Sequence, residues 1–231
     1  MRTIKNINDL KLGSILVLML CFTFLGCRKY FDPPDVFEEQ TVVNVKAKKV
    51  MLIVLDGVSG SDLKTIAPPK ITAMLAKSKY SWSGYSDFIV SDGTAWKNIM
   101  TGVGVGKHGI ADNTLDPNVG GTGSEHAAQT AWPTFIERLQ ASGKMRRLET
   151  ITPWKQLSDK LLIYADQPLI VASDLAVKDS TLNKLQKGND DLLVVNFNEI
   201  GKAGIANGFS ANVPAYKDAV LKTDAYIGEV L

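Results

Sequence analysis

The chain has 231 residues, of which 45% are hydrophobic and 22% charged, proportions that are ordinary for a globular protein. Its formal net charge is +2, and no run of basic residues forms a face after residue 26, so the sequence indicates no nucleic-acid partner. The length beyond that point is sufficient for one α/β domain with its own core.

The N-terminal segment, residues 1–26, has the features of a bacterial export signal. Basic residues at positions 2, 5 and 11 accompany an apolar run over residues 12–25, which is too short to span a bilayer comfortably. The run ends at Gly26-Cys27, and a small residue directly before a cysteine resembles a lipoprotein signal in which Cys27 is lipidated. The alternative is an ordinary secretory signal followed by an incidental cysteine.

A lipid anchor at Cys27 predicts a cell-envelope protein of the outer membrane, facing either the periplasm or the medium, with the membrane as its first partner. The other cysteine, Cys21, lies within the apolar run, so signal cleavage would leave no cysteine pair for a disulfide. Residues 27–47 are polar and contain a Pro-Pro pair, which indicates a tether between membrane and domain.

The elements of the domain begin near residue 48. Val50–Leu55 is continuously apolar and ends at Asp56-Gly57, a pattern typical of a strand buried on both faces. A pair of prolines then favours a helix over Lys70–Lys77, because proline suits the first turn of a helix. Aromatic and polar residues alternate over Tyr80–Val90, which predicts a second strand, and a helix is expected over Trp96–Met100.

The second half of the domain also alternates between helices and strands. In chain order we expect a helix over 133–141, strands over 147–152 and 161–165, a helix over 174–187, a strand over 191–197 and a helix over 216–231. This order predicts an α/β fold with a mainly parallel sheet flanked by helices on both faces. The chain stops within or directly after a helix, so residues 48–231 are expected to form a truncated domain.

The first candidate for chemistry is Asp56, at the end of the first strand. Ligands gather at the carboxyl ends of the strands in open parallel sheets, and a carboxylate followed by glycine can approach a metal closely there. The alternative interpretation is a turn, because any buried strand can end in Asp-Gly.

The second candidate is the segment Ser91–Val103, followed by Lys107-His108-Gly109-Ile110. Asp92 or Thr94 would stand at a helix N-terminus, where free N–H groups and the helix dipole bind anions and support a nucleophile or a metal-bound oxygen. The alternative is structural: either side chain would simply cap the helix.

The order of these motifs resembles the alkaline phosphatase superfamily, and within it the type I phosphodiesterase and nucleotide pyrophosphatase branch. A strand ending in Leu-Asp-Gly precedes Thr101-Gly102-Val103 and the Lys-His-Gly-Ile turn by the expected distance, and residues 197–231 echo a third family segment. The Asp-x-Thr-x-Trp run is also similar to lipid-anchored relatives from Bacteroidetes-type bacteria. The resemblance implies an alkaline-phosphatase-like core without its C-terminal part, and a pair of divalent metals, often zinc, that clamp a phosphoryl group.

Carried over by position, Asp56 matches the first metal-binding aspartate of the family. The nucleophile stands nine residues before the threonine of Thr-Gly, and counting back from Thr101 reaches Asp92 instead of a hydroxyl. Thr94, two residues later, would serve as nucleophile only in a reshaped loop.

The third segment departs further from the family pattern. Gly201 and Ile205 stand where the family has a metal-binding aspartate and histidine, and neither can bind a metal. Only two histidines exist in the chain: His108 matches a turn whose histidine is structural, and His126 lies in a polar loop. A zinc pair therefore cannot be assembled, and calcium or magnesium on Asp56 and Asp92 is the more plausible cofactor.

Two functions follow from these observations. One is a phosphodiesterase or phosphatase that hydrolyses phosphate esters weakly if at all, with Asp56 and Asp92 on a metal and Thr94 or Asp92 at the nucleophile position. The other is a non-catalytic lipoprotein that retains the fold for binding or scaffolding. A phosphate ester or another anionic small molecule is the expected ligand. The four tryptophans are expected in the core or at its rim, although one of them could line a ligand pocket.

Overall fold

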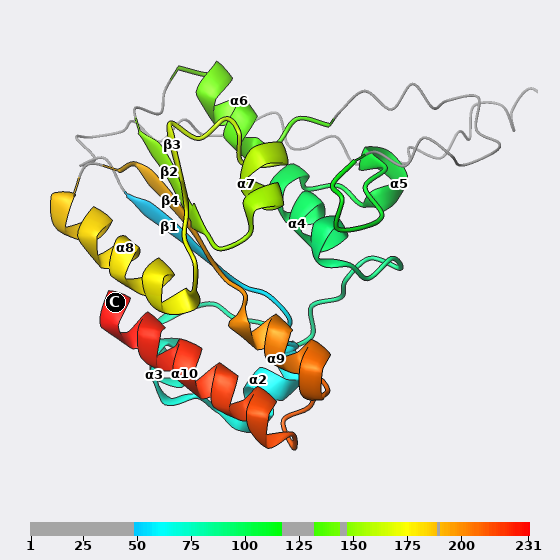
Figure 1. Ribbon diagram of the computed structural model, residues 1–231, viewed down its shortest axis with the longest axis vertical. Helices are drawn as coiled ribbons and strands as arrows, with labels where there is room; N and C mark the ends of the chain where they lie inside the picture. Colours follow the sequence, from blue (N-terminus) through cyan, green and yellow to red (C-terminus); the bar gives the residue numbers. More distant parts are fainter. Residues whose placement is uncertain (1–48, 117–131, 144–146, 189) are drawn as a thin grey trace, which may run out of the picture. The chain divides into compact units, whose positions relative to one another are not determined.

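The computed structural model describes residues 49–116, 132–143, 147–188 and 190–231 (Figure 1). Residues 1–26, the tether at 27–47, Cys27 and His126 lie outside this part of the chain, so the predictions that concern them stay predictions. The elements, in chain order, are β1 (Val50–Leu55), α2 (Gly60–Ile66), α3 (Pro69–Met74), the 3-10 turn η1 (Leu75–Lys77), α4 (Asp92–Thr101), α5 (Val105–His108), α6 (Phe135–Ala141), β2 (Leu148–Thr152), α7 (Lys155–Lys160), β3 (Gln167–Ile170), α8 (Asp174–Lys187), β4 (Leu192–Phe197), α9 (Glu199–Asn207) and α10 (Pro214–Val230).

The four strands form one parallel sheet in the order β1-β4-β2-β3. Its centre is β4, in which every residue is buried, whereas the edge strand β1 is partly exposed along its length. In β1 and β4 the run of apolar residues is unbroken except at Asn196, because both faces of the sheet are covered. The predicted α/β fold with a parallel sheet is confirmed.

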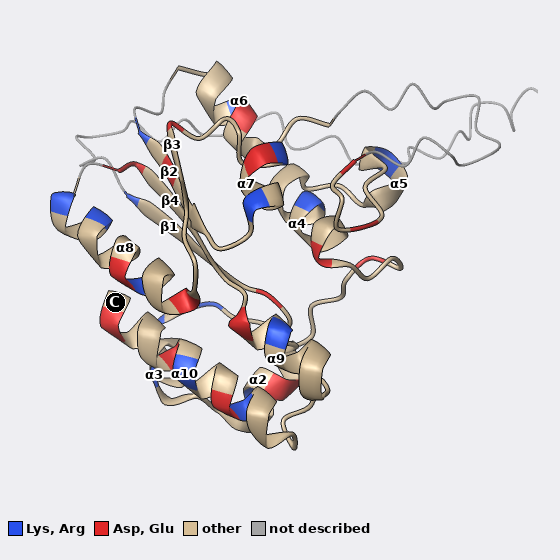
Figure 2. Ribbon diagram, viewed as in Figure 1, with Lys and Arg blue, Asp and Glu red and all other residues tan. Residues whose placement is uncertain are grey.

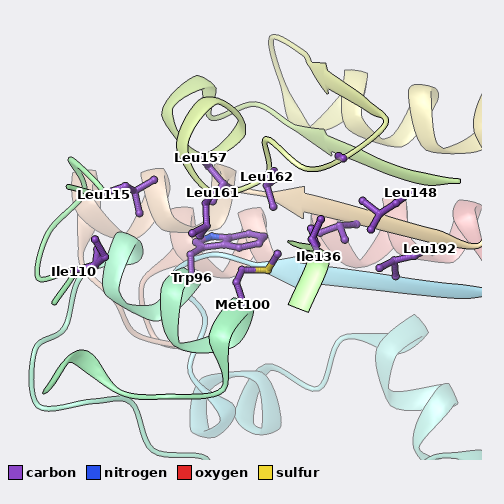
Figure 3. Packing of buried hydrophobic residues seen from close by; sticks show 12 residues of the cluster. Trp96, Met100, Ile110, Leu115, Ile136, Leu148, Leu157, Leu161, Leu162 and Leu192 are labelled. Carbon is purple, nitrogen blue, oxygen red and sulfur yellow. The ribbon is translucent and has the colours of Figure 1, made fainter. Parts of the chain in front are cut away.

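Each face of the sheet packs against its own group of helices. Leu192 and Val194 of β4 belong to a core with α4, α6 and α7, in which Trp96 is the largest buried side chain (Figure 3). Leu193 and Val195 point to the opposite face, where they pack with α8 and α10. The alternation follows from the period of two along a strand. None of the described helices is long and apolar enough to cross a membrane.

Two of the predicted strands are wrong. Residues 80–90 form neither strand nor helix, and Tyr85 and Phe88 are exposed by 98% and 82%, so the alternating aromatic residues have no sheet to pack against. Residues 161–165 form turns after α7, with Leu161 and Leu162 buried in the core. The edge strand at this place is β3, which begins at Gln167.

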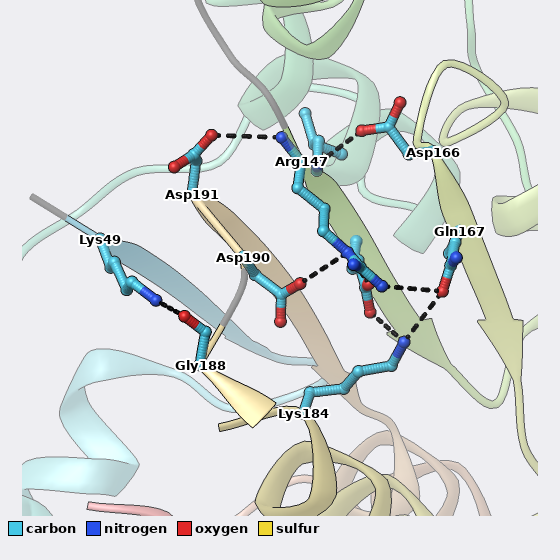
Figure 4. Close-up of polar contacts among 10 residues, drawn as sticks. Lys49, Arg147, Asp166, Gln167, Lys184, Gly188, Asp190 and Asp191 are labelled. Atoms are coloured by element: carbon cyan, nitrogen blue, oxygen red, sulfur yellow. Dashed lines mark hydrogen bonds and ion pairs between the residues drawn. The ribbon is translucent and has the colours of Figure 1, made fainter. Parts of the chain in front are cut away.

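A cluster of ion pairs lies at the end of the sheet where the strands begin (Figure 4). Glu149 of β2 is fully buried and lies between Arg147, which donates to it over 2.7 Å, and Lys184 of α8. Burial alone would raise the pKa of Glu149, but the hydrogen bonds from Lys184 and Arg147 outweigh it and hold this pKa below its usual value. The cluster fixes α8 against the sheet from the side opposite to the candidate site.

Candidate functional site

Asp56 follows β1 directly, at the carboxyl edge of the sheet. Its two carboxylate oxygens each accept a hydrogen bond from a neutral donor: the indole N–H of Trp96 donates to Oδ1 over 2.9 Å, and the amide of Asn196 donates to Oδ2 over 2.9 Å. Burial raises the pKa of Asp56 to about 6, against the lowering effect of these two hydrogen bonds. The partly buried carboxylate of Asp56 is thus stabilised by neutral hydrogen-bond donors, and it forms no ion pair within the residues that the structure describes.

Asn196 is held in one orientation by a second hydrogen bond. The hydroxyl of Thr152, at the end of β2, donates to its side-chain oxygen over 2.9 Å, which leaves the amide nitrogen to face Asp56. Both side chains are buried at the centre of the sheet edge. Sequence reasoning missed this role of Asn196, although a single amide inside an otherwise apolar strand was a signal, since buried amides need partners.

Asp92 is the first residue of α4 and lines a pocket of about 300 Å³ together with Asp56. The charge of Asp92 contributes to the raised pKa of Asp56, so the two carboxylates interact electrostatically. The second and third N–H groups of α4 are already used: Gly93 donates to the side-chain oxygen of Asn113 over 2.8 Å, and Thr94 donates to the side chain of Ser91. The structure therefore places the two predicted acidic residues, Asp56 and Asp92, in one pocket, and it adds Asn113 to the lining.

Thr94, the other predicted catalytic residue, is fully buried. Its hydroxyl donates to the carbonyl oxygen of Ile110 over 3.0 Å and lies 2.8 Å from the hydroxyl of Ser91, while its own N–H donates to Ser91. Thr94 does not belong to the pocket lining. In this arrangement Ser91 caps α4, and Thr94 ties the helix start to the loop that ends at Ile110. The role of Thr94 is thus structural, but the cap is Ser91 and neither Asp92 nor Thr94.

Helix α9 contributes residues to the pocket lining. Gly201 and Ile205, one turn apart, both line it, and Lys202 is the one cationic side chain among the described lining residues. Gly201 packs closely: a Cβ on Gly57 would lie 2.4 Å from its Cα, and Gly57 also has a φ of +76°. The glycine after Asp56 is therefore required by the packing of β1 against α9, as the turn interpretation of Asp-Gly expected.

Acidic side chains are concentrated where β1 ends and where α8 and α9 begin (Figure 2). The buried carboxylate of Asp174 accepts hydrogen bonds from the N–H groups of Asn198 and Glu199, both over 3.0 Å. In return Glu199 accepts from the N–H of Asp174, so the two helix starts cap each other. Burial raises the pKa of Asp174, and its charge in turn raises that of Asp56.

The donor set of the pocket does not fit a pair of zinc ions. Within the described residues no group of three histidine, cysteine, aspartate or glutamate side chains could hold a metal ion. His108 is buried and accepts a hydrogen bond from the N–H of Ile110, away from the pocket lining. Oxygen atoms of Asp56, Asp92 and Asn113 remain at the pocket, and such donors suit a weakly held hard cation better than zinc.

Comparison with solved structures identifies the fold. The chain aligns with murine ectonucleotide pyrophosphatase/phosphodiesterase 5, solved as an inactive variant in complex with AMP, at a TM-score of 0.61 and 15% identity. It also aligns with phosphonoacetate hydrolase from Sinorhizobium meliloti 1021, in complex with phosphonoformate, at a TM-score of 0.53 and 15% identity. The chain has an alkaline-phosphatase-like fold. The alignments cover 79% and 80% of this chain but 51% and 53% of the two enzymes, so this alkaline-phosphatase-like domain spans about half of their length.

At this level of identity the likeness concerns the fold alone. No protein-family model matches the sequence, and no curated protein matches it. In the described part of this alkaline-phosphatase-like domain, Asp56 accepts hydrogen bonds from neutral donors, and Gly201 and Ile205 line the pocket.

Proposed function

We propose that this chain is a cell-envelope lipoprotein whose alkaline-phosphatase-like domain binds a small polar ligand and hydrolyses phosphate esters feebly at most. The pocket lies at the carboxyl edge of a parallel sheet, the place where such folds bind ligands. A two-metal hydrolase needs ligands on both ions, because each ion stabilises a different oxygen of the in-line displacement.

The observation that carries the proposal is the environment of Asp56. Both of its oxygens accept hydrogen bonds from uncharged side chains, Trp96 and Asn196, and burial raises its pKa to about 6. A carboxylate that binds a divalent cation in a two-metal site has several anionic or imidazole ligands beside it. Here Asp92 is one such neighbour, but the positions on α9 that line the pocket are occupied by Gly201 and Ile205.

The test is an assay of the full chain, purified in detergent, with chromogenic phosphate mono- and diesters. Zinc, magnesium, calcium and manganese are supplied one at a time, and Asp56→Ala and Asp92→Ala serve as matched variants. We expect little or no turnover with any metal. Robust turnover that both variants abolish would sink the proposal, because it would require a metal site assembled around these two carboxylates.

A second candidate is a weak hydrolase that uses calcium or magnesium. It is favoured by one observation: Asp56 and Asp92 line the same pocket and interact electrostatically. Residues Asp56, Asp92 and Asn113 would hold the ion, which would neutralise the carboxylates and polarise an ester oxygen. Turnover restricted to these two metals and saturating only at millimolar ion would favour this candidate over the first.

The lipid anchor has its own test. Cys27 stands after a small residue and a short apolar run, the pattern of a lipidated cysteine. Replacement Cys27→Ser should release the protein from the membrane fraction, while Cys21→Ser should leave it anchored because that residue leaves with the signal. A Cys27→Ser protein that stays membrane-bound and uncleaved would contradict the proposal.

A further inference from the structure

We propose that the pocket beside Asp56 takes an uncharged, hydroxyl-rich ring, the chemistry of a single sugar unit, stacked against Trp154. This inference rests on the proposed function, because a binding site without turnover must still select a ligand. It differs from the phosphate-ester ligand that the sequence led us to expect, and the difference comes from three properties of the pocket lining: its charge, its free polar groups and its aromatic wall.

The charge of the lining disfavours an anion. Among the described lining residues, the two carboxylates Asp56 and Asp92 outnumber the one cationic side chain, Lys202. The start of α4, which would otherwise attract a phosphate, has its N–H groups of Gly93 and Thr94 bonded to side chains. A phosphate dianion would therefore meet repulsion and few free donors here.

The free polar groups of the lining suit hydroxyls instead. Asn113 lines the pocket and uses its oxygen to accept from Gly93, and its amide nitrogen has no hydrogen-bond partner among the described residues. Asn198 also lines the pocket. Exposed Gln156 offers one more donor and acceptor.

A hydroxyl group both donates and accepts, so a ring with several hydroxyls can satisfy such a mixed lining, whereas the dianion of a phosphate ester only accepts. Polar lining groups that a ligand leaves without a partner cost free energy, so a ligand that offers both donors and acceptors is favoured. The lining therefore favours a ligand that has hydrogen-bond donors as well as acceptors.

Trp154 is the aromatic residue of the lining against which a sugar ring would stack. Trp154 lies between the end of β2 and the start of α7, lines the pocket, and packs partly against the core around Trp96. Ile205, exposed by 74%, extends the apolar surface on α9. With about 300 Å³, the pocket is at the small end of ligand sites, which fits one ring and not a polymer segment.

The experiment measures binding of defined probes to the full chain in detergent, by saturation-transfer NMR and titration calorimetry in the presence of a chelator. The neutral probes are methyl glycosides of glucose, galactose, mannose and N-acetylglucosamine; the anionic probes are glucose 6-phosphate and inorganic phosphate. We expect at least one neutral glycoside to saturate and inorganic phosphate not to bind. Trp154→Ala should weaken the glycoside at least tenfold, and Gln156→Ala several-fold.

Two controls keep the outcomes separate. Trp82→Ala removes a tryptophan that does not line the pocket and should leave binding unchanged. Gln156 is exposed, so its variant tests the site even where Trp154→Ala fails to fold. The inference is overturned where no neutral glycoside binds, where the phosphates bind better than the glycosides, or where Trp154→Ala and Gln156→Ala bind as the parent does. Robust ester turnover would instead overturn the proposed function, whichever probe binds.

Discussion

Two carboxylates lie at opposite ends of the strands of the same sheet, one fully buried and one partly buried, and their surroundings differ in charge. Glu149, where the strands begin, lies between the cationic groups of Arg147 and Lys184, and its pKa is held below the usual value. Asp56, where the strands end, accepts hydrogen bonds from the neutral side chains of Trp96 and Asn196 and forms no ion pair among the described residues, and burial raises its pKa to about 6.

The difference separates a structural carboxylate from a candidate functional one. A buried charge with its counterions in place costs little and fixes packing, as Glu149 does between β2 and α8. A buried carboxyl whose charge is left uncompensated costs stability, and such costs concentrate where a site needs an unusual protonation state. The position of Asp56, at the end of the sheet where ligands bind, agrees with this interpretation.

The largest loss of stability is expected from breaking the ion pair between Lys184 and Glu149. Lys184→Met removes one counterion of fully buried Glu149, and breaking a buried ion pair costs about 3 kcal/mol of unfolding free energy. Urea denaturation measures the loss. Lys155→Met is the control, because Lys155 pairs with Asp159 on the surface and its loss should stay within the error of measurement. Equal stability of the two variants would remove the contrast between the edges.

The raised pKa of Asp56 should make the stability of the protein depend on pH. A carboxyl with a raised folded pKa stabilises the protein fully below its unfolded value of 3.8, and this contribution is lost as pH rises through about 6. Between pH 3.8 and 6 the loss approaches roughly 3 kcal/mol, the energy of a shift of about two pKa units. Denaturation of the parent and of Asp56→Asn across this range, with a chelator present, measures it. A difference between the two proteins that does not change with pH would contradict the raised pKa.

The same contrast shows what the sequence could predict. The strands β1 and β4 are evident because unbroken apolar runs are buried on both faces, and Asp56 is conspicuous because it ends one of them. The contacts that define its chemistry are not visible in the chain, since Trp96 lies 40 residues away and Asn196 lies 140 residues away.

Local patterns also misled where no tertiary partner existed to support them. The aromatic alternation at 80–90 has the period of a strand, but no described strand pairs with it, and most of its side chains are exposed. Motif spacing led to Asp92, which lines the same pocket as Asp56, yet it could not tell that the hydroxyl of Thr94 faces the interior.

A smaller effect is expected from the indole donor of the site. Trp96→Phe keeps most of the buried ring and removes the N–H that donates to Asp56, so it should cost about 1–2 kcal/mol of unfolding free energy. The pKa of Asp56, followed by carbon NMR, should rise further because a group that favours the ionised form is lost. Trp132→Phe is the matched control, because Trp132 does not contact Asp56. An unchanged pKa would mean that Trp96 does not solvate this carboxylate.

The smallest effect is expected at Thr94, and it distinguishes a structural role of this residue at the start of α4 from a catalytic one. Thr94→Val removes a buried hydroxyl that donates to the carbonyl of Ile110, and we expect a loss of about 1 kcal/mol with ligand binding and any residual ester turnover unchanged. Thr101→Val, at the other end of the same helix, is the control, because its hydroxyl bonds back to the carbonyl of Lys97 and is partly exposed. A Thr94→Val protein that folds normally but loses all residual turnover, while Thr101→Val retains it, would show that the loop rearranges to bring Thr94 to the phosphorus. The pocket beside Asp56 would then be an active site in an inactive conformation. The contrast between Asp56 and Glu149 would reflect that conformation and not the absence of activity.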